Sequence, residues 1–476
     1  MIRNGKKKAI SCALVAAMSV GLAACGTTSY DFKVSYDGIK TGDVSSKVSV
    51  HDPSILKADG EYYIFGSHMS AAKSSDLLNW EKVADGYSKK NPVYGQIYDV
   101  ADEAFAYSGS KNSLIKTDDK QVHVWAPDVI YNETTGLYYM YYCTTSTWNA
   151  SNLCYGTSTT PEGPYEWQGA LIYSGFNRKT ISGTDVLDYV DEDYAYKNYI
   201  KGAQYNYEDY PNAIDPTVFY DADGRMWMVY GSWSGGIFLL EIDKTTGLVI
   251  HPEADKANNV DPYYGKRLLG GGHISIEGPY IMYDETSGYY YLFVSYGALT
   301  SNGGYQVRVF RSKTVDGEYV DMNGKYPEKS AQHQNFGLKL TGNYKLPSLE
   351  KAYMATGHNS AFVDDDGRMY LVYHTRFNDN GEGHSPRVHQ MLVNEDGWPC
   401  ELPYQTQGET VNKDGYDIDD IIGRYYVINQ GTAIDSKIAN PVILYLEKNG
   451  KVKGEKSEGT WECKDGSYYI CLLYTS

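Results

Sequence analysis

Residues 51–67 read HDPSILKADGEYYIFGS, a phrase made of a polar lead residue, an apolar run, a glycine turn and an aromatic-rich run. The phrase returns four times, and the turn glycines follow Gly60 at steps of 76, 88, 64 and 79 residues. A unit of this length fits four strands with their loops, because strands average about 5–6 residues. The later copies are APDVIYNETTGLYYMYYC (126–143), IDPTVFYDADGRMWMVYGS (214–232), EGPYIMYDETSGYYYLFVSYG (277–297) and GHNSAFVDDDGRMYLVYHT (357–375).

Five repeated units predict an all-β fold, namely a five-bladed β-propeller over residues 46–400. The Asp-Gly pairs that end in Gly60, Gly224 and Gly367 are typical of tight hairpin turns. The 48 glycines and 48 tyrosines agree with many turns and half-buried strands. Residues 410–476 predict a small C-terminal β-domain, which we expect to be incomplete because the chain stops within an apolar run.

The N-terminus predicts export. Arg3 and the lysines at 6–8 precede a short apolar run that is too short for a membrane span. The run ends in LAACG at 22–26, which resembles the lipobox of bacterial lipoproteins. We therefore expect residues 1–25 to be a lipoprotein signal peptide ending at an acylated Cys25, and residues 26–45 to be a tether. An ordinary signal peptide is the alternative, so the protein is expected to be lipid-anchored at a bacterial surface or secreted.

Charge and cysteine content limit the partners. The formal charge of −17 disfavours nucleic acid, and it disfavours anionic membranes except through the lipid anchor. Seven cysteines without paired CxxC motifs give no metal-site pattern. Cys143 and Cys154 flank a turn-like segment, and a disulfide between them is left open. We expect a monomer.

The lead residues of the five phrases are candidates for chemistry, because a ring of sheets would bring them to one centre. They are Asp52, Asp128, Asp215, Glu277 and His358. Inverting hydrolysis of a glycosidic bond needs a base and an acid about 6.5–9.5 Å apart. A further carboxylate nearby raises the pKa of the acid, because like charges resist coexisting.

The motifs around these residues resemble glycoside hydrolase family 43, and more narrowly its extracellular endo-α-1,5-L-arabinanases. The resemblance runs over about residues 46–400, with the motifs in order, and the β-rich tail is similar to the C-terminal domain of those enzymes. It rests on HDPS (51–54), WAPD (125–128), NAIDP (212–216), IEGPY (276–280) and GHNS (357–360).

The resemblance implies roles for individual residues. Asp52 would be the general base and Glu277 the general acid. Asp215 would raise the pKa of the acid and orient its side chain. Asp128 would be structural, since the acid of WAPD is not catalytic in the family. His358 would hold one calcium ion together with water, which a lone histidine would not suggest because calcium prefers oxygen ligands.

Residues expected to contact the substrate follow from the same motifs and from neighbouring aromatic positions. The tryptophans are candidates because sugar C–H groups favour aromatic faces. His273 precedes Glu277 by four residues, which on a strand would place both on one face. The expected set is Asn212, Ala213, Ile214, Ser232, Trp233, Ser234, Trp125, Trp148, His273 and Arg376.

The resemblance predicts an inverting hydrolase of internal α-1,5-L-arabinofuranosidic bonds in arabinan, a pectic side chain. An exo-acting β-xylosidase or α-L-arabinofuranosidase of the same family would share the three carboxylates. A non-catalytic surface glycan-binding propeller is the alternative from another class, and an intact base and acid argue against it.

Overall fold

The computed structural model describes residues 29–35, 46–86, 88–98, 101–108, 123–145, 150–327, 333–379, 381–463 and 467–474. The signal peptide and lipobox predicted for residues 1–25, most of the predicted tether, and Trp148 lie outside the described residues. Among the described residues, no helix has the length and apolar character that a membrane crossing requires.

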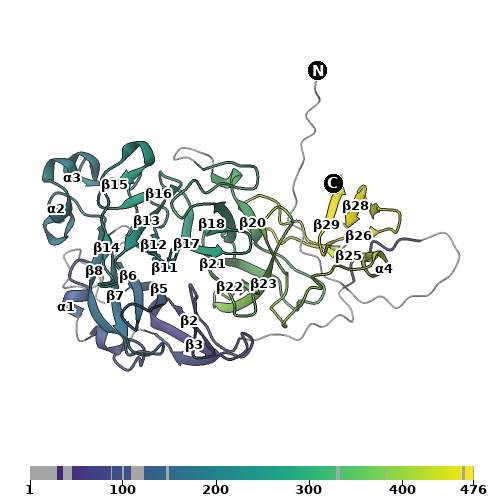
Figure 1. Ribbon diagram of the computed structural model, residues 1–476, viewed down its shortest axis with the longest axis horizontal. Coiled ribbons are helices and arrows are strands. Elements are labelled where there is room, and N and C mark those ends of the chain that lie inside the picture. The colour runs from purple at the N-terminus through teal and green to yellow at the C-terminus, as the bar shows by residue number, and fades with distance from the viewer. Residues whose placement is uncertain are drawn as a thin grey trace, which may run out of the picture.

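The all-β prediction is confirmed, because the described residues form six antiparallel sheets of four or more strands and only short helices (Figure 1). Each of the first five begins with the first strand of one phrase. The first sheet holds β1 (Ser54–Ala58), β2 (Glu61–Gly66), β3 (Ser70–Ser74) and β4 (Glu81–Ala84); the second holds β5 (His123–Asn132), β6 (Leu137–Thr145), β7 (Ser151–Ser158) and β8 (Glu166–Ser174). The third holds β11 (Thr217–Tyr220), β12 (Met226–Tyr230), β13 (Ile237–Ile242), β14 (Val249–Ile250), β15 (Val260–Asp261) and β16 (Gly265–Leu269). The fourth holds β17 (Ile276–Asp284), β18 (Tyr289–Tyr296), β19 (Gln306–Ser312) and β20 (Leu338–Thr341); the fifth holds β21 (Tyr353–Val363), β22 (Met369–Phe377), β23 (Ser385–Val393) and β24 (Pro399–Glu401).

The first strands of these sheets contact one another in a closed cycle, from β1 to β5, β11, β17, β21 and back to β1. A separate apolar core fills the space between each consecutive pair of sheets. The closing core packs Tyr370 and Val372 of the fifth sheet against Ile55 and Ile64 of the first. The repeated phrases therefore place their lead residues around one axis.

Helices are few and short. They are α1 (Ala101–Ala104), α2 (Val186–Tyr189), α3 (Glu192–Asn198) and α4 (Ile418–Ile421), with 3-10 turns at Ser67–Met69, Gly95–Tyr98, Ile181–Gly183, Lys256–Asn258 and His333–Asn335. α2 and α3 belong to an insertion before the third sheet, which also contains the small hairpin β9 (Ile200–Lys201) and β10 (Gln204–Tyr205). Asp191 caps α3 by accepting a hydrogen bond from the Tyr194 backbone N–H at 2.7 Å. This insertion stands at the end of the molecule opposite the C-terminal domain (Figure 1).

The hairpin turns form where the sequence predicts them. Ala58 pairs with Glu61, so Asp59 and Gly60 alone make the turn, with φ of 53° and 81°. Two positive φ values are those of a type I′ turn, whose twist matches the flanking strands. Gly136, Gly224, Gly288 and Gly367 take positive φ at the corresponding turns.

The backbone aligns the five phrases differently from the sequence prediction at two of the lead positions. In each phrase one of the first two residues adopts a left-handed conformation. These residues are Asp52, Ala126, Asp215, Gly278 and His358, with φ between 44° and 56°. Ala126 rather than Asp128 therefore occupies the lead position of the second phrase, and Glu277 precedes that position by one residue.

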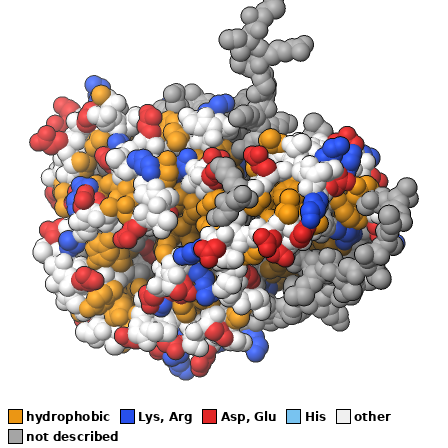
Figure 2. Space-filling model, turned by 45° about the vertical axis from the view of Figure 1, so that its right-hand side comes forward, with side chains coloured by type: hydrophobic (Ala, Val, Ile, Leu, Met, Phe, Trp, Pro, Cys, Tyr) orange, Lys and Arg blue, Asp and Glu red, His pale blue; other side chains and the backbone are white. Residues whose placement is uncertain are grey.

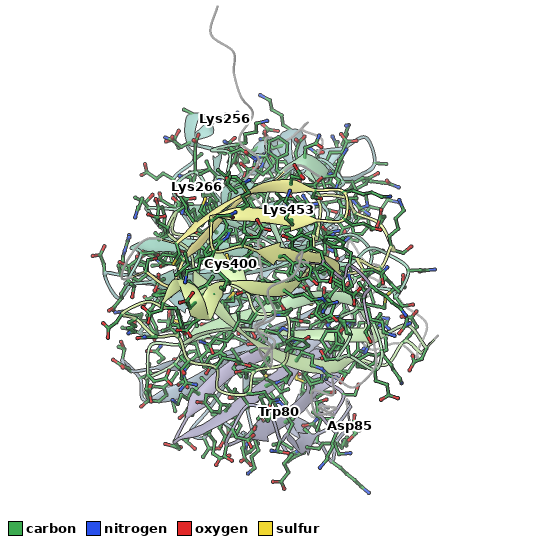
Figure 3. The ribbon with its side chains drawn as sticks, turned by 90° about the vertical axis from the view of Figure 1, so that its right-hand side faces the viewer. Trp80, Asp85, Lys256, Lys266, Cys400 and Lys453 are labelled. Atoms are coloured by element: carbon green, nitrogen blue, oxygen red, sulfur yellow. The ribbon has the colours of Figure 1, made fainter. Side chains whose placement is uncertain are left out.

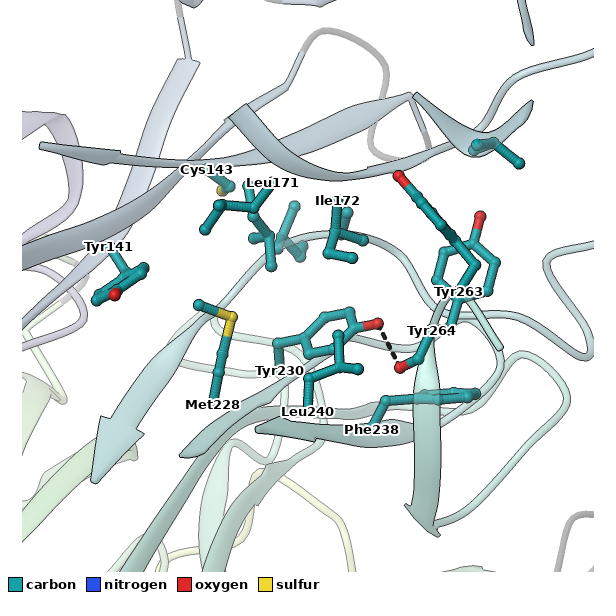
Figure 4. Close-up of a cluster of buried hydrophobic side chains, with 14 of the residues drawn as sticks. Tyr141, Cys143, Leu171, Ile172, Met228, Tyr230, Phe238, Leu240, Tyr263 and Tyr264 are labelled. Atoms are coloured by element: carbon teal, nitrogen blue, oxygen red, sulfur yellow. Dashed lines mark hydrogen bonds between the residues drawn. The ribbon is translucent and has the colours of Figure 1, made fainter. Parts of the chain in front are cut away.

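Cys143 and Cys154 are free thiols, so the disulfide left open by the sequence does not form. Cys143 pairs with Leu153 on the neighbouring strand, whereas Cys154 pairs with Tyr142. Because side chains alternate along a strand, the two sulfurs point to opposite faces of the second sheet. Cys143 lies in the core shared with the third sheet, among the side chains shown in Figure 4, and Cys154 lies in the core shared with the first.

The C-terminal sheet forms a separate β-domain, as predicted. Its order is β25 (Gly423–Val427), β26 (Val442–Leu446), β27 (Lys451–Gly454), β28 (Glu458–Cys463) and β29 (Ile470–Tyr474). Figure 3 views the molecule from this side, with Lys453 of β27 toward the viewer and Trp80 of the first sheet below. Residues 29–35 run along this domain, where Arg424 Nη2 donates to the Lys33 carbonyl at 2.9 Å. Acidic and basic side chains are interspersed over the surface in Figure 2.

Candidate active site

Asp52 sits at the centre of the ring in an environment that keeps it ionised. Its Oδ1 lies 3.0 Å from His358 Nδ1 and 3.1 Å from His51 Nε2. Ser67 donates a hydrogen bond to the other carboxylate oxygen. Burial alone would raise the pKa of Asp52, but the charge of His358, with His51, outweighs it and holds the pKa well below its usual range. This carboxylate is able to accept a proton.

Asp215 and Glu277 are held toward the protonated form. Burial raises the pKa of Asp215 to about 7, against the opposing effect of His358, and the charges of Glu277 and Asp52 add to the rise. Burial likewise raises the pKa of Glu277, and Asp52 contributes in the same direction. The three carboxylates thus influence one another as members of one buried group, with one depressed pKa and two raised ones.

Glu277 is fixed in position by hydrogen bonds to both of its oxygens. Tyr305 OH donates to Oε1 at 2.6 Å, and Trp233 Nε1 donates to Oε2 at 2.6 Å. Gly357 makes the first contact possible, because a Cβ there would lie 2.3 Å from the Tyr305 ring. The next residue after the acid, Gly278, donates its backbone N–H to Asp215 Oδ2 at 3.2 Å. The Glu277–Gly278 segment therefore carries the acid and also binds the Asp215 carboxylate.

His358 lies among all three carboxylates. Burial would lower its pKa, but Asp52, Asp215 and Glu277 together raise it to about 9. Its ring packs against Gly278, where a Cβ would stand 3.0 Å from His358 Cγ. The side chains around this histidine are carboxylates, which makes the centre attractive to a positive ion. The carboxylate oxygens therefore fit a hard cation in charge and ligand type, whereas His358 would have to lose its proton to act as a ligand.

Three further histidines, His51, His374 and His384, pack beside Asp52. Their nitrogen atoms lie within 4.8 Å of one another, a spacing that would suit a metal ion. However, Arg376 Nη2 lies 2.9 Å from His384 Nε2. The guanidinium can only donate, so this nitrogen acts as the acceptor, and the nearby cation opposes binding of a second one. The rings instead stack, with His51 and His384 centroids 3.9 Å apart, and form a wall behind Asp52.

Arg376 is buried, and its guanidinium is bound by neighbouring groups of the protein. It is 3 % exposed, and its Nε donates to the Leu299 carbonyl at 2.8 Å. Its Nη1 lies 2.6 Å from a carboxylate oxygen of Glu382, which in turn accepts from Ser301 Oγ at 2.7 Å. The guanidinium is thus engaged within the protein, and a contact with substrate stays a prediction. Arg376 ties the loop after β22 to the loop after β18 and holds His384 in the wall.

The remaining predicted contacts separate into buried supports and accessible side chains. Asn212, Ala213 and Ile214 are buried. Ser174 Oγ donates a hydrogen bond to Asn212 Oδ1 and accepts one from the Ala213 backbone N–H. Ser232 and Ser234 are also buried, with Ser232 Oγ 3.5 Å from Glu277 Oε2. His273 precedes β17 instead of lying on it, and it is exposed beside Trp233. Trp125 is half-buried on β5 and packs on the core of the second and third sheets.

Comparison with known proteins identifies the family. The chain matches the family described as "Glycosyl hydrolases family 43" over residues 44–209 and 191–399. The chain belongs to glycoside hydrolase family 43. Residues 403–475 match a C-terminal lipocalin-like domain associated with this family.

Two similar curated members of family 43 are extracellular endo-α-(1→5)-L-arabinanases. The one from Thermotoga petrophila is 39 % identical over 436 residues, covering 89 % of this chain and 84 % of that protein. The second, from Bacillus subtilis, is 37 % identical over 444 residues, covering 88 % and 83 %. A crystal structure of endo-1,5-α-L-arabinanase from Thermotoga petrophila superposes with a TM-score of 0.75 at 37 % identity, covering 92 % of this chain and 91 % of that one.

Three residues of this family 43 site were not found from the sequence. Tyr305 lies outside every phrase, and nothing in its surroundings marks it as a partner of Glu277. Ser67 ends the first phrase, and no sequence pattern marks it as a site residue. Its backbone N–H donates a hydrogen bond to the His51 carbonyl at 2.8 Å. His384 stands in GHSPRVH, and its histidine content was a usable signal.

Asp128 supports the ring, as the family resemblance implied. It accepts a hydrogen bond from Ser54 of the first sheet and one from the Val218 backbone N–H of the third, at 2.6 Å for the latter. Burial raises its pKa to about 7. The carboxyl thus joins the first strands of three consecutive sheets.

Proposed function

We propose that this family 43 protein is an inverting endo-α-1,5-L-arabinanase that cleaves internal bonds of arabinan. The observation that carries the proposal is the division of the three central carboxylates into one with a depressed pKa and two with raised pKa values. A depressed pKa favours the ionised form that a base needs, and a raised pKa favours the protonated form that an acid needs. The names of the two curated relatives support arabinan as the substrate.

In this mechanism Asp52 removes a proton from the attacking water as its oxygen bonds to the anomeric carbon. Glu277 donates its proton to the glycosidic oxygen as the bond to the leaving chain breaks. Attack from the face opposite the leaving group inverts the anomeric configuration. Burial raises the pKa of Asp215 to about 7, so this carboxyl is partly protonated near pH 7, while burial together with Asp52 raises the pKa of Glu277.

The proposal includes one calcium ion held by His358 and water, as the resemblance implied. The carboxylates around His358 raise its pKa to about 9, so this position favours a positive charge. When bound, a divalent cation would supply that charge and favour the ionised form of Asp52. Removing calcium with EDTA is expected to lower activity and to change the melting temperature, and calcium is expected to restore both. Unchanged melting and activity after complete metal removal would contradict this part.

We further propose that the five sheets form a five-bladed β-propeller over residues 46–400, followed by a C-terminal domain over 410–476. The closed cycle of first strands and the five inter-sheet cores support the blade count. The LAACG motif supports a signal peptide at 1–25 with lipid attachment at Cys25 and a tether at 26–45. Export agrees with the relatives, which are named extracellular, and we propose a monomer at the cell surface.

Product analysis tests the proposed function. On linear arabinan the enzyme is expected to release short oligomers early, and on xylan it is expected to release little. Monomer as the sole product would support the exo alternative instead, and binding without any product would support a glycan-binding protein.

The role of Glu277 has its own test. Glu277→Gln is expected to lower the rate on linear arabinan by about 10²–10⁴-fold while the melting temperature and circular dichroism are retained. Glu285→Gln, a change of the same kind in the β17–β18 turn, provides the control. Full activity of Glu277→Gln would assign the acid to another residue.

A further inference from the structure

A row of three aromatic rings leads away from Glu277. Trp233 donates its indole N–H to the acid, and its ring centroid lies 5.5 Å from that of His273. The His273 ring lies 5.9 Å from Tyr207 in an edge-to-face arrangement. Trp233 and His273 are expected substrate contacts, whereas Tyr207 comes from the insertion that contains α2 and α3.

The row is accessible to a ligand. Tyr207 is 37 % exposed, which is high for a large aromatic side chain, and His273 is also exposed. Trp233 is half-buried beneath them. An exposed run of rings that starts at a catalytic acid offers a continuous surface to a chain of sugars, because sugar C–H groups pack favourably on aromatic faces.

The row is also held in place before any ligand binds. The backbone N–H of Gly272 donates to the Glu208 carbonyl at 2.7 Å, and that of Gly235 donates to the Gly272 carbonyl at 2.9 Å. Lys201 Nζ lies 2.6 Å from a carboxylate oxygen of Glu208. These contacts attach the turn that carries Tyr207 to the loop before the acid. A rigid aromatic surface loses little entropy on binding.

The position of the row relative to the acid indicates which part of the substrate it contacts. Glu277 acts on the oxygen that joins the cleaved sugar to the leaving chain. Tyr305, which bonds Glu277 Oε1, stacks on His374 of the histidine wall with ring centroids 5.9 Å apart, whereas Trp233 bonds Oε2, so the wall and the aromatic row adjoin different oxygens of the acid. A surface that continues outward from the acid therefore faces the leaving chain.

We propose that Tyr207, through the row Trp233–His273–Tyr207, forms a distal subsite for arabinose units on the leaving-group side. This inference rests on the proposed arabinanase function and adds a determinant of chain-length preference. Longer arabino-oligosaccharides reach Tyr207, whereas arabinotriose does not extend far enough on that side to use it fully.

The test compares kcat/KM for arabinopentaose and arabinotriose. In Tyr207→Ala the pentaose-to-triose ratio is expected to fall about three- to tenfold, the range for loss of one aromatic contact. Tyr207→Phe keeps the ring and is expected to retain the wild-type ratio. His273→Ala removes the middle ring and is expected to lower the ratio in the same direction.

Tyr189 provides a matched control. It is an exposed tyrosine of the same insertion, and its ring also packs on a histidine, His251, at 3.7 Å. Tyr189→Ala is expected to leave the ratio unchanged. An unchanged ratio in Tyr207→Ala, or an equal fall in Tyr189→Ala, would overturn the subsite.

Different results would contradict the proposed arabinanase function and the Tyr207 subsite. If the wild-type protein releases no oligomers from linear arabinan, the proposed function and the subsite both fall. If the wild-type protein is active and the length preference is insensitive to Tyr207, the subsite alone falls. Cleavage patterns of reducing-end-labelled arabinopentaose add a second readout, because loss of a leaving-side subsite shifts cleavage toward the reducing end.

Discussion

We expect the hydrogen bond from Tyr305 to Glu277 to set the alkaline limit of activity, and Tyr305→Phe tests this expectation. Tyr305 OH donates to Glu277 Oε1 at 2.6 Å. Burial, with Glu277 alongside, raises the pKa of Tyr305 well above its usual value, so the phenol keeps its proton throughout. The donor stabilises the ionised form of Glu277 and lowers its pKa against the effect of burial.

The magnitude follows from the strength of this bond. A hydrogen bond to a charged group contributes about 1.5–3 kcal/mol. One pKa unit corresponds to about 1.4 kcal/mol, so removal of the bond is expected to raise the pKa of Glu277 by about one to two units. The acid must be protonated to work, and the rate falls as pH rises through its pKa. The alkaline limb of the pH profile is therefore expected to move upward by about one to two units.

The assay is kcat/KM on a linear arabino-oligosaccharide across pH 4–10, with calcium and ionic strength held constant. This parameter reports groups of the free enzyme. Tyr296→Phe is the matched control, because Tyr296 is a buried tyrosine of β18 whose hydroxyl has no hydrogen-bond partner within the described part of the chain. An alkaline limb that stays in place in Tyr305→Phe, or moves to lower pH, would refute the reasoning.

Three further predictions concern the support of the site. Gly357→Ala would place a Cβ 2.3 Å from the Tyr305 ring, so its pH profile is expected to move in the same direction as that of Tyr305→Phe, and an unchanged profile would contradict the packing. Burial raises the pKa of Asp128 to about 7, so the folded chain keeps a proton that the unfolded chain releases near pH 4. The free energy of unfolding therefore falls as pH rises between these two values. Urea unfolding is therefore expected to show the free energy of Asp128→Asn rising relative to wild type from about pH 4 to 7, and a constant difference would count against the raised pKa. Cys143 and Cys154 are expected to alkylate only after unfolding, with no need for a reductant, and a mass change on reduction would show a disulfide instead.

The sequence predicted the fold because its information is local and repeated. Each phrase carries a turn glycine and an alternating strand pattern, and these dictate hairpins without help from distant residues. The conserved order of five lead segments within one chain also indicated where the centre would lie. Asp52, Asp215 and Glu277 were found in this way.

The repeat predicted the wrong lead residue where the spacing of the side chains did not match the backbone conformation. Asp128 resembles a lead residue in sequence, but the left-handed residue of its phrase is Ala126, so its carboxyl points into the contact between sheets. Arg376 stands in a strand that reaches the centre, yet its donors are taken up by Leu299, Glu382 and His384. Such competition between partners is invisible in a linear pattern.

By itself, the sequence determined the five hairpin units, the C-terminal β-domain and the identity of the acidic residues, because turn chemistry and strand alternation act between near neighbours. Only the tertiary structure decided the surroundings of each acid. Against the effect of burial, His358 of the fifth sheet depresses the pKa of Asp52 beside the first sheet, whereas burial in the closed ring raises the pKa of Glu277. Electrostatic interactions act through space, so the protonation of this site follows from closure of the ring and not from any one of its repeats.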